Sequence, residues 1–148
     1  MTSRSLLFGS GDTSRATDVG LLILRLGFGL TLAFAHGLGK IPPSQGFIDG
    51  AVAGMGLPAP TLFAWLAALS EFVGGLLIAV GLLTRPAAVF VAMTMAVAFL
   101  VAHGGALTGD NSGEMAFLYL VASVALAFTG AGRLSLDARI APRPATYA

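Results

Sequence analysis

Several ionisable residues interrupt the apolar stretches of this chain, where a charged side chain is costly and usually has a partner. The first stretch, RLGFGLTLAFAHGLGK at 25–40, contains Arg25, His36 and Lys40. Later stretches add Glu71, His103 and Glu114. Imidazole and carboxylate groups exchange protons, and cationic groups bind carbonyl oxygens or anions. These residues are therefore the candidates for any chemistry that the chain performs.

Helical spacing brings two of these residues toward each other. Counted at 1.5 Å per residue from the shared end of two helices, Arg25 lies about 9 Å deep and Glu71 about 18 Å deep. We therefore expect Arg25 to pair with Glu71 across the first two helices. Such a pair either only fixes helix packing, since buried ion pairs add little stability, or also lines a ligand pocket. The sequence leaves both interpretations open.

Four polar residues gather near the opposite end of the predicted helices: His36, Lys40, His103 and Glu114. One interpretation is a metal-binding or proton-handling site. The other is that these residues mark helix ends, where they bind free carbonyls or extend to water. No tight spacing such as HxxxH occurs, so we predict no metal site. We assign Glu71 and His36 as candidate catalytic residues. The candidate substrate-binding residues are Arg25, Lys40, His103 and Glu114.

The composition is that of a membrane protein. Of 148 residues, 56% are hydrophobic and only 10% are charged, against about 25% charged in a soluble domain. The mean hydropathy is +0.88. No cluster of lysine and arginine could follow a phosphate backbone, so nucleic acid is not an expected partner. Cysteine is absent, which excludes disulfides and thiolate chemistry within the chain. Lipid is therefore the expected surrounding.

The chain predicts an all-α, four-helix transmembrane bundle. Residues 1–18 read as a flexible cytoplasmic tail in which Asp18 is a candidate N-cap, residues 19–140 as the membrane domain, and 141–148 as a second flexible tail. Loop 40–60 is long enough to hold a short interfacial helix near Phe47–Met55. Gly74 and Gly75 would let a neighbouring helix approach closely. The four spans, each near the length that crosses a bilayer, are 19–39, 61–83, 86–103 and 114–131.

The distribution of basic residues predicts the orientation. If there are four spans, the arginines of both tails and of the turn between the second and third spans fall on one side of the membrane. The opposite loops carry only Lys40. Both termini should therefore be cytoplasmic, and the two longer loops should face outward.

Several short motifs occur in a fixed order along the chain. They are Arg25, H-G-x-G-K at 36–40, S-E-F-V-G-G at 70–75, G-L-L-T-R at 81–85 and G-A-G-R-L-S-L-D at 130–137. Together they resemble the DoxX family of small bacterial membrane proteins. The likeness covers about residues 19–140. It implies a four-helix bundle of the bacterial inner membrane, with Arg85 and Asp137 as further family-like positions. We expect Asp137 to cap a helix or dock the tail.

The resemblance also implies a link to oxidoreductases, because family members are named as quinone-linked oxidoreductase subunits and as partners in oxidative-stress complexes. The leading hypothesis is therefore a membrane subunit that binds a quinone between its helices. It would work with a soluble redox enzyme or as a homo-oligomer. One alternative is a non-catalytic membrane anchor for soluble redox enzymes, and another is a small transporter.

Overall fold

The computed structural model describes residues 14–140, and within this range every regular element is helical. The predictions for residues 1–13 and 141–148 lie outside the described residues. The elements are α2 (Arg15–Thr31) with the turns Leu32–Gly37 and Leu38–Lys40, the loop helices Phe47–Val52 and Ala53–Met55, α3 (Pro60–Leu69) with the turn Ser70–Gly74, α4 (Gly75–Val80), α5 (Thr84–Val97) with the turn Ala98–Ala102, α6 (Glu114–Thr129) and α7 (Leu136–Ile140).

Three continuous helical units are long and apolar enough to cross a membrane: Arg15–Lys40, Pro60–Val80 and Thr84–Ala102. The fourth, α6, is a shorter apolar helix of 16 residues. The all-α prediction is confirmed, with three long apolar helices and one shorter one. The predicted helix in loop 40–60 is also present, as the pair Phe47–Val52 and Ala53–Met55.

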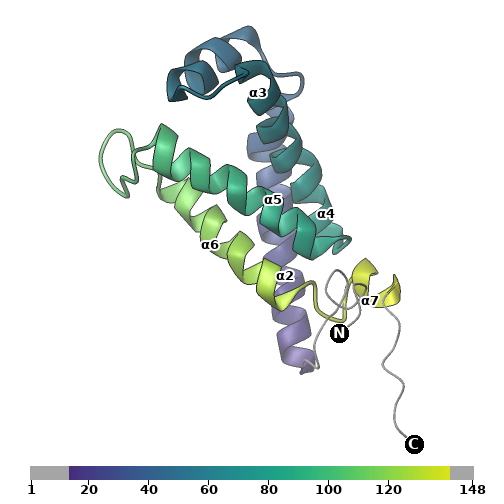
Figure 1. The fold of residues 1–148 in the computed structure, drawn as a ribbon. Coiled ribbons are helices and arrows are strands. Elements are labelled where there is room, and N and C mark those ends of the chain that lie inside the picture. Colours follow the sequence, from purple (N-terminus) through teal and green to yellow (C-terminus); the bar gives the residue numbers. More distant parts are fainter. Residues whose placement is uncertain (1–13, 141–148) are drawn as a thin grey trace, which may run out of the picture.

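The long helices alternate in direction (Figure 1). One end of the molecule carries the start of α2, the α4–α5 turn and α7, and we call it the terminal end. The other end carries the connections 41–59 and 103–113, and we call it the loop end. Toward the loop end, α5 and α6 run away from α3.

The first helix begins one turn earlier than the sequence suggested. Ser14 is its N-cap, and its side chain accepts a hydrogen bond from the Thr17 amide at 3.2 Å. The prediction of Asp18 as the N-cap is therefore wrong. Asp18 lies buried in the first turn and accepts a hydrogen bond from the Arg133 amide at 2.8 Å. Serine is as good an N-cap as aspartate, and Asp18 instead holds the C-terminal segment.

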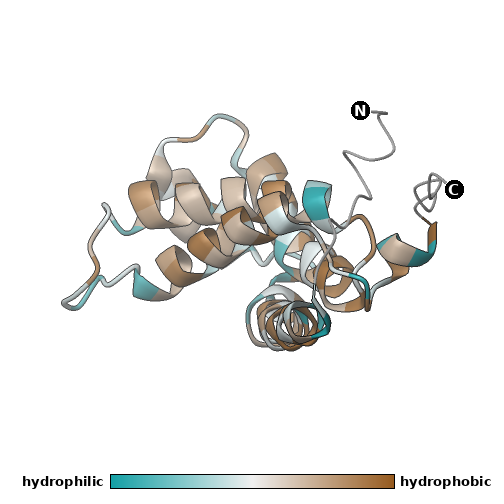
Figure 2. Ribbon diagram, turned by 90° about the horizontal axis from the view of Figure 1, so that it is seen from below, coloured by the Kyte–Doolittle hydropathy of each residue, from teal (hydrophilic) through white to brown (hydrophobic). Residues whose placement is uncertain are grey.

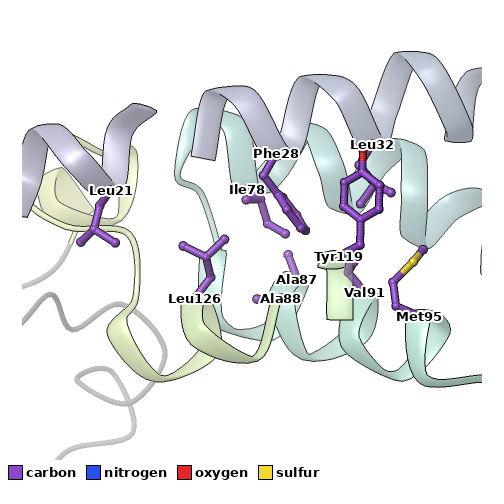
Figure 3. Close-up of a cluster of buried hydrophobic side chains, with 10 residues drawn as sticks. All are labelled: Leu21, Phe28, Leu32, Ile78, Ala87, Ala88, Val91, Met95, Tyr119 and Leu126. Atoms are coloured by element: carbon purple, nitrogen blue, oxygen red, sulfur yellow. The ribbon is translucent and has the colours of Figure 1, made fainter. Parts of the chain in front are cut away.

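The apolar core lies between α2, α4, α5 and α6 (Figure 3). Leu32, Ile78, Val91 and Leu126 are completely buried there. The ring of Phe28 meets the edge of Tyr119 with the centroids 5.2 Å apart, a favoured aromatic geometry. This core fixes α2 and α4 side by side and so determines what the loop end can bring together.

Glycines allow the first two units to touch. A side chain at Gly29 would collide with the backbone of Gly75 and with Ala79, and one at Gly37 would collide with the backbone at Phe72. The predicted close approach at Gly75 is therefore confirmed. Small residues at such crossings let helix backbones pack directly in a membrane. The contact at Gly37 also places the end of the first unit beside Glu71.

Large apolar side chains are exposed along all four apolar helices, including Ile23, Leu62, Met93 and Leu118. Figure 2 shows that hydrophobic residues dominate the helices and that hydrophilic ones concentrate at helix ends and in loops. In a bilayer these side chains contact lipid, because the hydrocarbon core needs apolar surface along the whole span.

Candidate functional site

An ion pair joins the first two helical units at the loop end. The Lys40 ammonium donates to both carboxylate oxygens of Glu71, each at 2.6 Å. The Glu71 side chain is only 5% exposed, while Lys40 is 29% exposed. Glu71 lies in the π-helical turn Ser70–Gly74, and Lys40 follows the π-helical turn Leu32–Gly37. Single π-helical turns re-aim side chains and are frequent at functional sites.

The predicted pairing of Arg25 with Glu71 is wrong. Arg25 is completely buried, but its guanidinium donates to the carbonyl oxygens of Leu134 at 2.6 Å, Ala79 at 3.4 Å and Ile78 at 3.5 Å. A helical side chain leans back toward the N-terminus of its helix. Arg25 therefore reaches the terminal end, where it binds carbonyls of the last turn of α4. The depth of Arg25 along its helix, counted from the sequence, does not reveal in which direction the side chain extends.

A cavity of about 330 Å³ lies beside the ion pair, between α3 and α5. The loop helices Phe47–Val52 and Ala53–Met55 line it at the loop end. Its polar lining comes from Lys40, Glu71, Thr94 and His103. The rest of the lining is apolar and consists of Phe47, Ala51, Val52, Met55, Leu57, Phe63, Leu66, Ala67, Phe90, Met93, Val97, Ala98 and Ala102.

Two further contacts shape the polar part of the cavity. The Lys40 ammonium lies 5.5 Å from the centre of the Phe47 ring, within the range of a cation–π interaction. The Thr94 hydroxyl donates to Ser70 Oγ at 2.9 Å. The sequence reasoning missed Thr94 and Phe47 as site residues. A hydroxyl within the apolar third span was the available signal for Thr94, whereas nothing local marks Phe47.

The other predicted site residues take different places. His103 lines the cavity, and its Nδ1 lies 3.3 Å from the Asn111 carbonyl oxygen. His36 packs instead against the Tyr119 ring at 5.4 Å. Glu114 is exposed as the first residue of α6. The cavity thus brings together Glu71, Lys40 and His103 but not Arg25, His36 or Glu114.

Asp137 acts as a helix cap, as the sequence predicted. Its carboxylate accepts hydrogen bonds from the amides of Leu83 at 2.7 Å and Thr84 at 2.9 Å, at the start of α5. Its own amide donates to the Gly81 carbonyl at 2.8 Å. A carboxylate at this position is favoured by the free amides and the dipole of the helix. Asp137 therefore docks the C-terminal segment onto the α4–α5 turn.

The cavity is suited to a flat molecule that carries a carbonyl group. Its apolar walls fit a ring, and its volume lies at the lower end of ordinary ligand pockets. An ammonium can donate a hydrogen bond to a carbonyl oxygen, and a neighbouring carboxylate or imidazole can exchange a proton. All three groups line the same cavity.

Comparison with known proteins adds a family assignment. The DoxX family model matches residues 20–104. "Putative oxidoreductase CatD" of Bacillus subtilis is 34% identical over 124 residues, which cover 84% of this chain and 89% of that protein. "Inner membrane protein YphA" of Escherichia coli is 37% identical over 138 residues, which cover 86% of this chain and 95% of that protein. No solved structure matches.

These relatives and the apolar helices bear out the prediction of a multi-pass protein of the bacterial inner membrane. The family match extends from the start of the first span to just past His103, so it includes both members of the Lys40–Glu71 pair. The chain belongs to the DoxX family.

Proposed function

We propose that this chain is the membrane subunit of an oxidoreductase system and that it binds a quinone in the cavity between α3 and α5. The observation that carries the proposal is the Lys40–Glu71 pair, which lies within hydrogen-bonding distance and borders an apolar cavity. The name of the Bacillus subtilis relative as an oxidoreductase supports the same class of function.

Each polar lining residue has a role in this proposal. Lys40 donates a hydrogen bond to one quinone carbonyl oxygen. Glu71 accepts and returns a proton at that end, and His103 serves the other side of the cavity. Reduction of a quinone to a quinol takes up two electrons and two protons. The electrons come from a soluble redox enzyme that associates with the bundle, and the protons pass through Glu71 and His103.

The terminal end faces the cytoplasm in this proposal. The structure gathers Arg15, Arg85, Arg133 and Arg139 at that end, whereas Lys40 lies at the loop end. Lysine and arginine are enriched in cytoplasmic loops and tails. The cavity then lies in the outer half of the membrane.

A non-catalytic anchor is the second candidate. Arg15, Arg133 and Arg139 are exposed at the terminal end, and they offer a cationic surface to an acidic soluble enzyme. In this alternative the cavity has no ligand, and the Lys40–Glu71 pair only fixes helix packing, as buried pairs often do.

The test is native mass spectrometry of the full chain purified in mild detergent, with the bound small molecules extracted and identified. We expect a stoichiometric quinone on the wild type and on Glu114→Gln, and none on Glu71→Gln. Glu114→Gln makes the same chemical change at an exposed glutamate away from the cavity. A folded wild-type protein without quinone, purified together with a soluble enzyme, would support the anchor instead.

A further inference from the structure

The cavity reaches the lipid-facing surface of the bundle. Met93 and Val97 line the cavity, yet their side chains are 59% and 37% exposed. They lie one turn apart on α5, so both face the same side of that helix. Met93 is at the middle of the span Thr84–Ala102. Side chains that line a cavity and are also exposed at this depth mark an opening toward the bilayer.

The loop end of the cavity is partly covered by the loop helices. Val52 and Ile48 of the helix Phe47–Val52 are buried and pack with Ala64 of α3. Val52, Met55 and Leu57 line the cavity from this side. This apolar contact places the loop helices between the cavity and the aqueous phase. A ligand that enters between α3 and α5 therefore passes apolar residues, whereas the loop end also presents the partly exposed Lys40.

We propose that the cavity opens sideways into the bilayer between α3 and α5, and that its occupant is a tailed molecule dissolved in the membrane. A carbonyl-bearing ring meets Lys40 and Glu71, and a hydrocarbon tail passes between Leu66 on α3 and Met93 on α5 into the lipid. This inference rests on the proposed function and narrows the ligand to quinones that carry a long tail.

Size and polarity both favour a ligand that is only partly enclosed. About 330 Å³ suits a ring-sized head group, so a long tail must remain outside the cavity. The residues at the opening, Leu66, Met93 and Val97, are all apolar. A tail that stays in lipid keeps its apolar surroundings and needs no further protein contacts.

The two helices that border the cavity diverge. In Figure 1, α5 runs away from α3 toward the loop end, and the cavity lies between these two helices. The apolar core packs α5 against α2, α4 and α6 (Figure 3). The divergence is therefore part of the folded bundle and agrees with an opening between α3 and α5.

The experiment is photolabelling of the full chain in nanodiscs of phosphatidylethanolamine and phosphatidylglycerol. The probe is a quinone with a diazirine on the first unit of its tail, and the labelled residues are mapped by mass spectrometry. Leu118 and Val121 on α6 serve as internal controls, because they are 54% and 50% exposed and away from the cavity. We expect several-fold more label at Met93 and Val97 than at these controls.

Three comparisons interpret the result. Excess tail-less quinone should compete with the probe and remove the additional label at Met93 and Val97. The Glu71→Gln variant should show no additional label at these two residues. A diazirine fatty acid should label α5 and α6 equally. If the tail-less quinone binds but the tailed probe labels both helices equally, the sideways opening is wrong and the proposed function stands. If neither quinone binds, the proposed function itself fails. Stronger labelling of α5 by the fatty acid, undisturbed by quinone, would assign the cavity to an acyl lipid and overturn the inference.

Discussion

The two ends of the bundle use buried charge in opposite ways. At the terminal end, Arg25 and Asp137 are bound to main-chain carbonyls and amides. At the loop end, Lys40 and Glu71 are bound to each other and border a cavity. Both arrangements give charged groups hydrogen-bond partners inside an apolar protein, but they differ in whether those partners can be exchanged for a ligand.

The main-chain partners of Arg25 and Asp137 cannot move without disrupting the backbone at the terminal end. The role of these two side chains is therefore to stabilise the fold. The side chains of an ion pair can turn toward a ligand without disturbing the main chain. Losing a partner is costly for the fully buried charges of the terminal end, whereas the partly exposed Lys40 can turn toward the membrane surface. The loop end, however, has a cavity beside the ion pair, and in the proposed function its occupant becomes a hydrogen-bond partner of Lys40. Buried charge therefore stabilises one end and forms a candidate site at the other.

The largest expected effect is on Arg25. Arg25→Met removes the donor to three carbonyl oxygens at the terminal end, and the free energy of unfolding should fall by about 3 kcal/mol, because buried carbonyls lose a charged donor. Unfolding in a detergent titration, followed by circular dichroism, measures this. The exposed Arg139→Met is the control and should change little. Equal midpoints of unfolding for Arg25→Met and Arg139→Met would contradict the assigned role of Arg25.

A second test compares two glycines of α2. Gly29→Ala forces a methyl group into the backbone of Gly75, whereas Gly27→Ala points into open space. We expect Gly29→Ala to destabilise the bundle by about 1–3 kcal/mol through overpacking. Gly27→Ala should be neutral or stabilising, because alanine is the better helix former. The same unfolding titration measures both, and equal behaviour would show that α2 and α4 are not in close contact.

The helix cap should have a smaller effect. Asp137→Ala leaves the Leu83 and Thr84 amides without their acceptor, and the free energy of unfolding should fall by about 1–2 kcal/mol. Asp110→Ala, at an exposed loop position, is the control. Hydrogen exchange at the start of α5 should increase only in Asp137→Ala. An unchanged exchange rate there would mean that the C-terminal segment docks by other contacts.

The smallest effect concerns the two histidines. His103 lines the cavity and His36 does not. His103→Ala should weaken quinone binding by up to about tenfold, the value of one hydrogen bond, whereas His36→Ala should leave the affinity unchanged. Titration of the quinone into purified protein measures both. A larger loss of quinone affinity in His36→Ala than in His103→Ala would mean that the quinone binds near Tyr119 instead.

The sequence was sufficient for the presence of the apolar helices and for the glycine contact at Gly75, because both depend on local pattern and spacing, although it placed the start of the first helix one turn too late. The role of Asp137 was expected from the family-like motif at 130–137. The sequence failed for the partner of Arg25, since depth along a helix does not say which way a long side chain turns. Nor did it indicate that Phe47 would approach Lys40. That contact depends on how loop 40–60 folds back over α3, which is a property of the tertiary structure.

The most direct test of the contrast between the two ends measures quinone affinity and unfolding midpoint together for Glu71→Gln and Asp137→Asn. The account predicts that Glu71→Gln loses quinone binding and keeps its midpoint, because Lys40 is partly exposed and can extend to the membrane surface. Asp137→Asn should keep its affinity and unfold earlier. If Glu71→Gln unfolds early while the remaining folded protein binds quinone normally, the Lys40–Glu71 pair is structural and the proposed site is wrong.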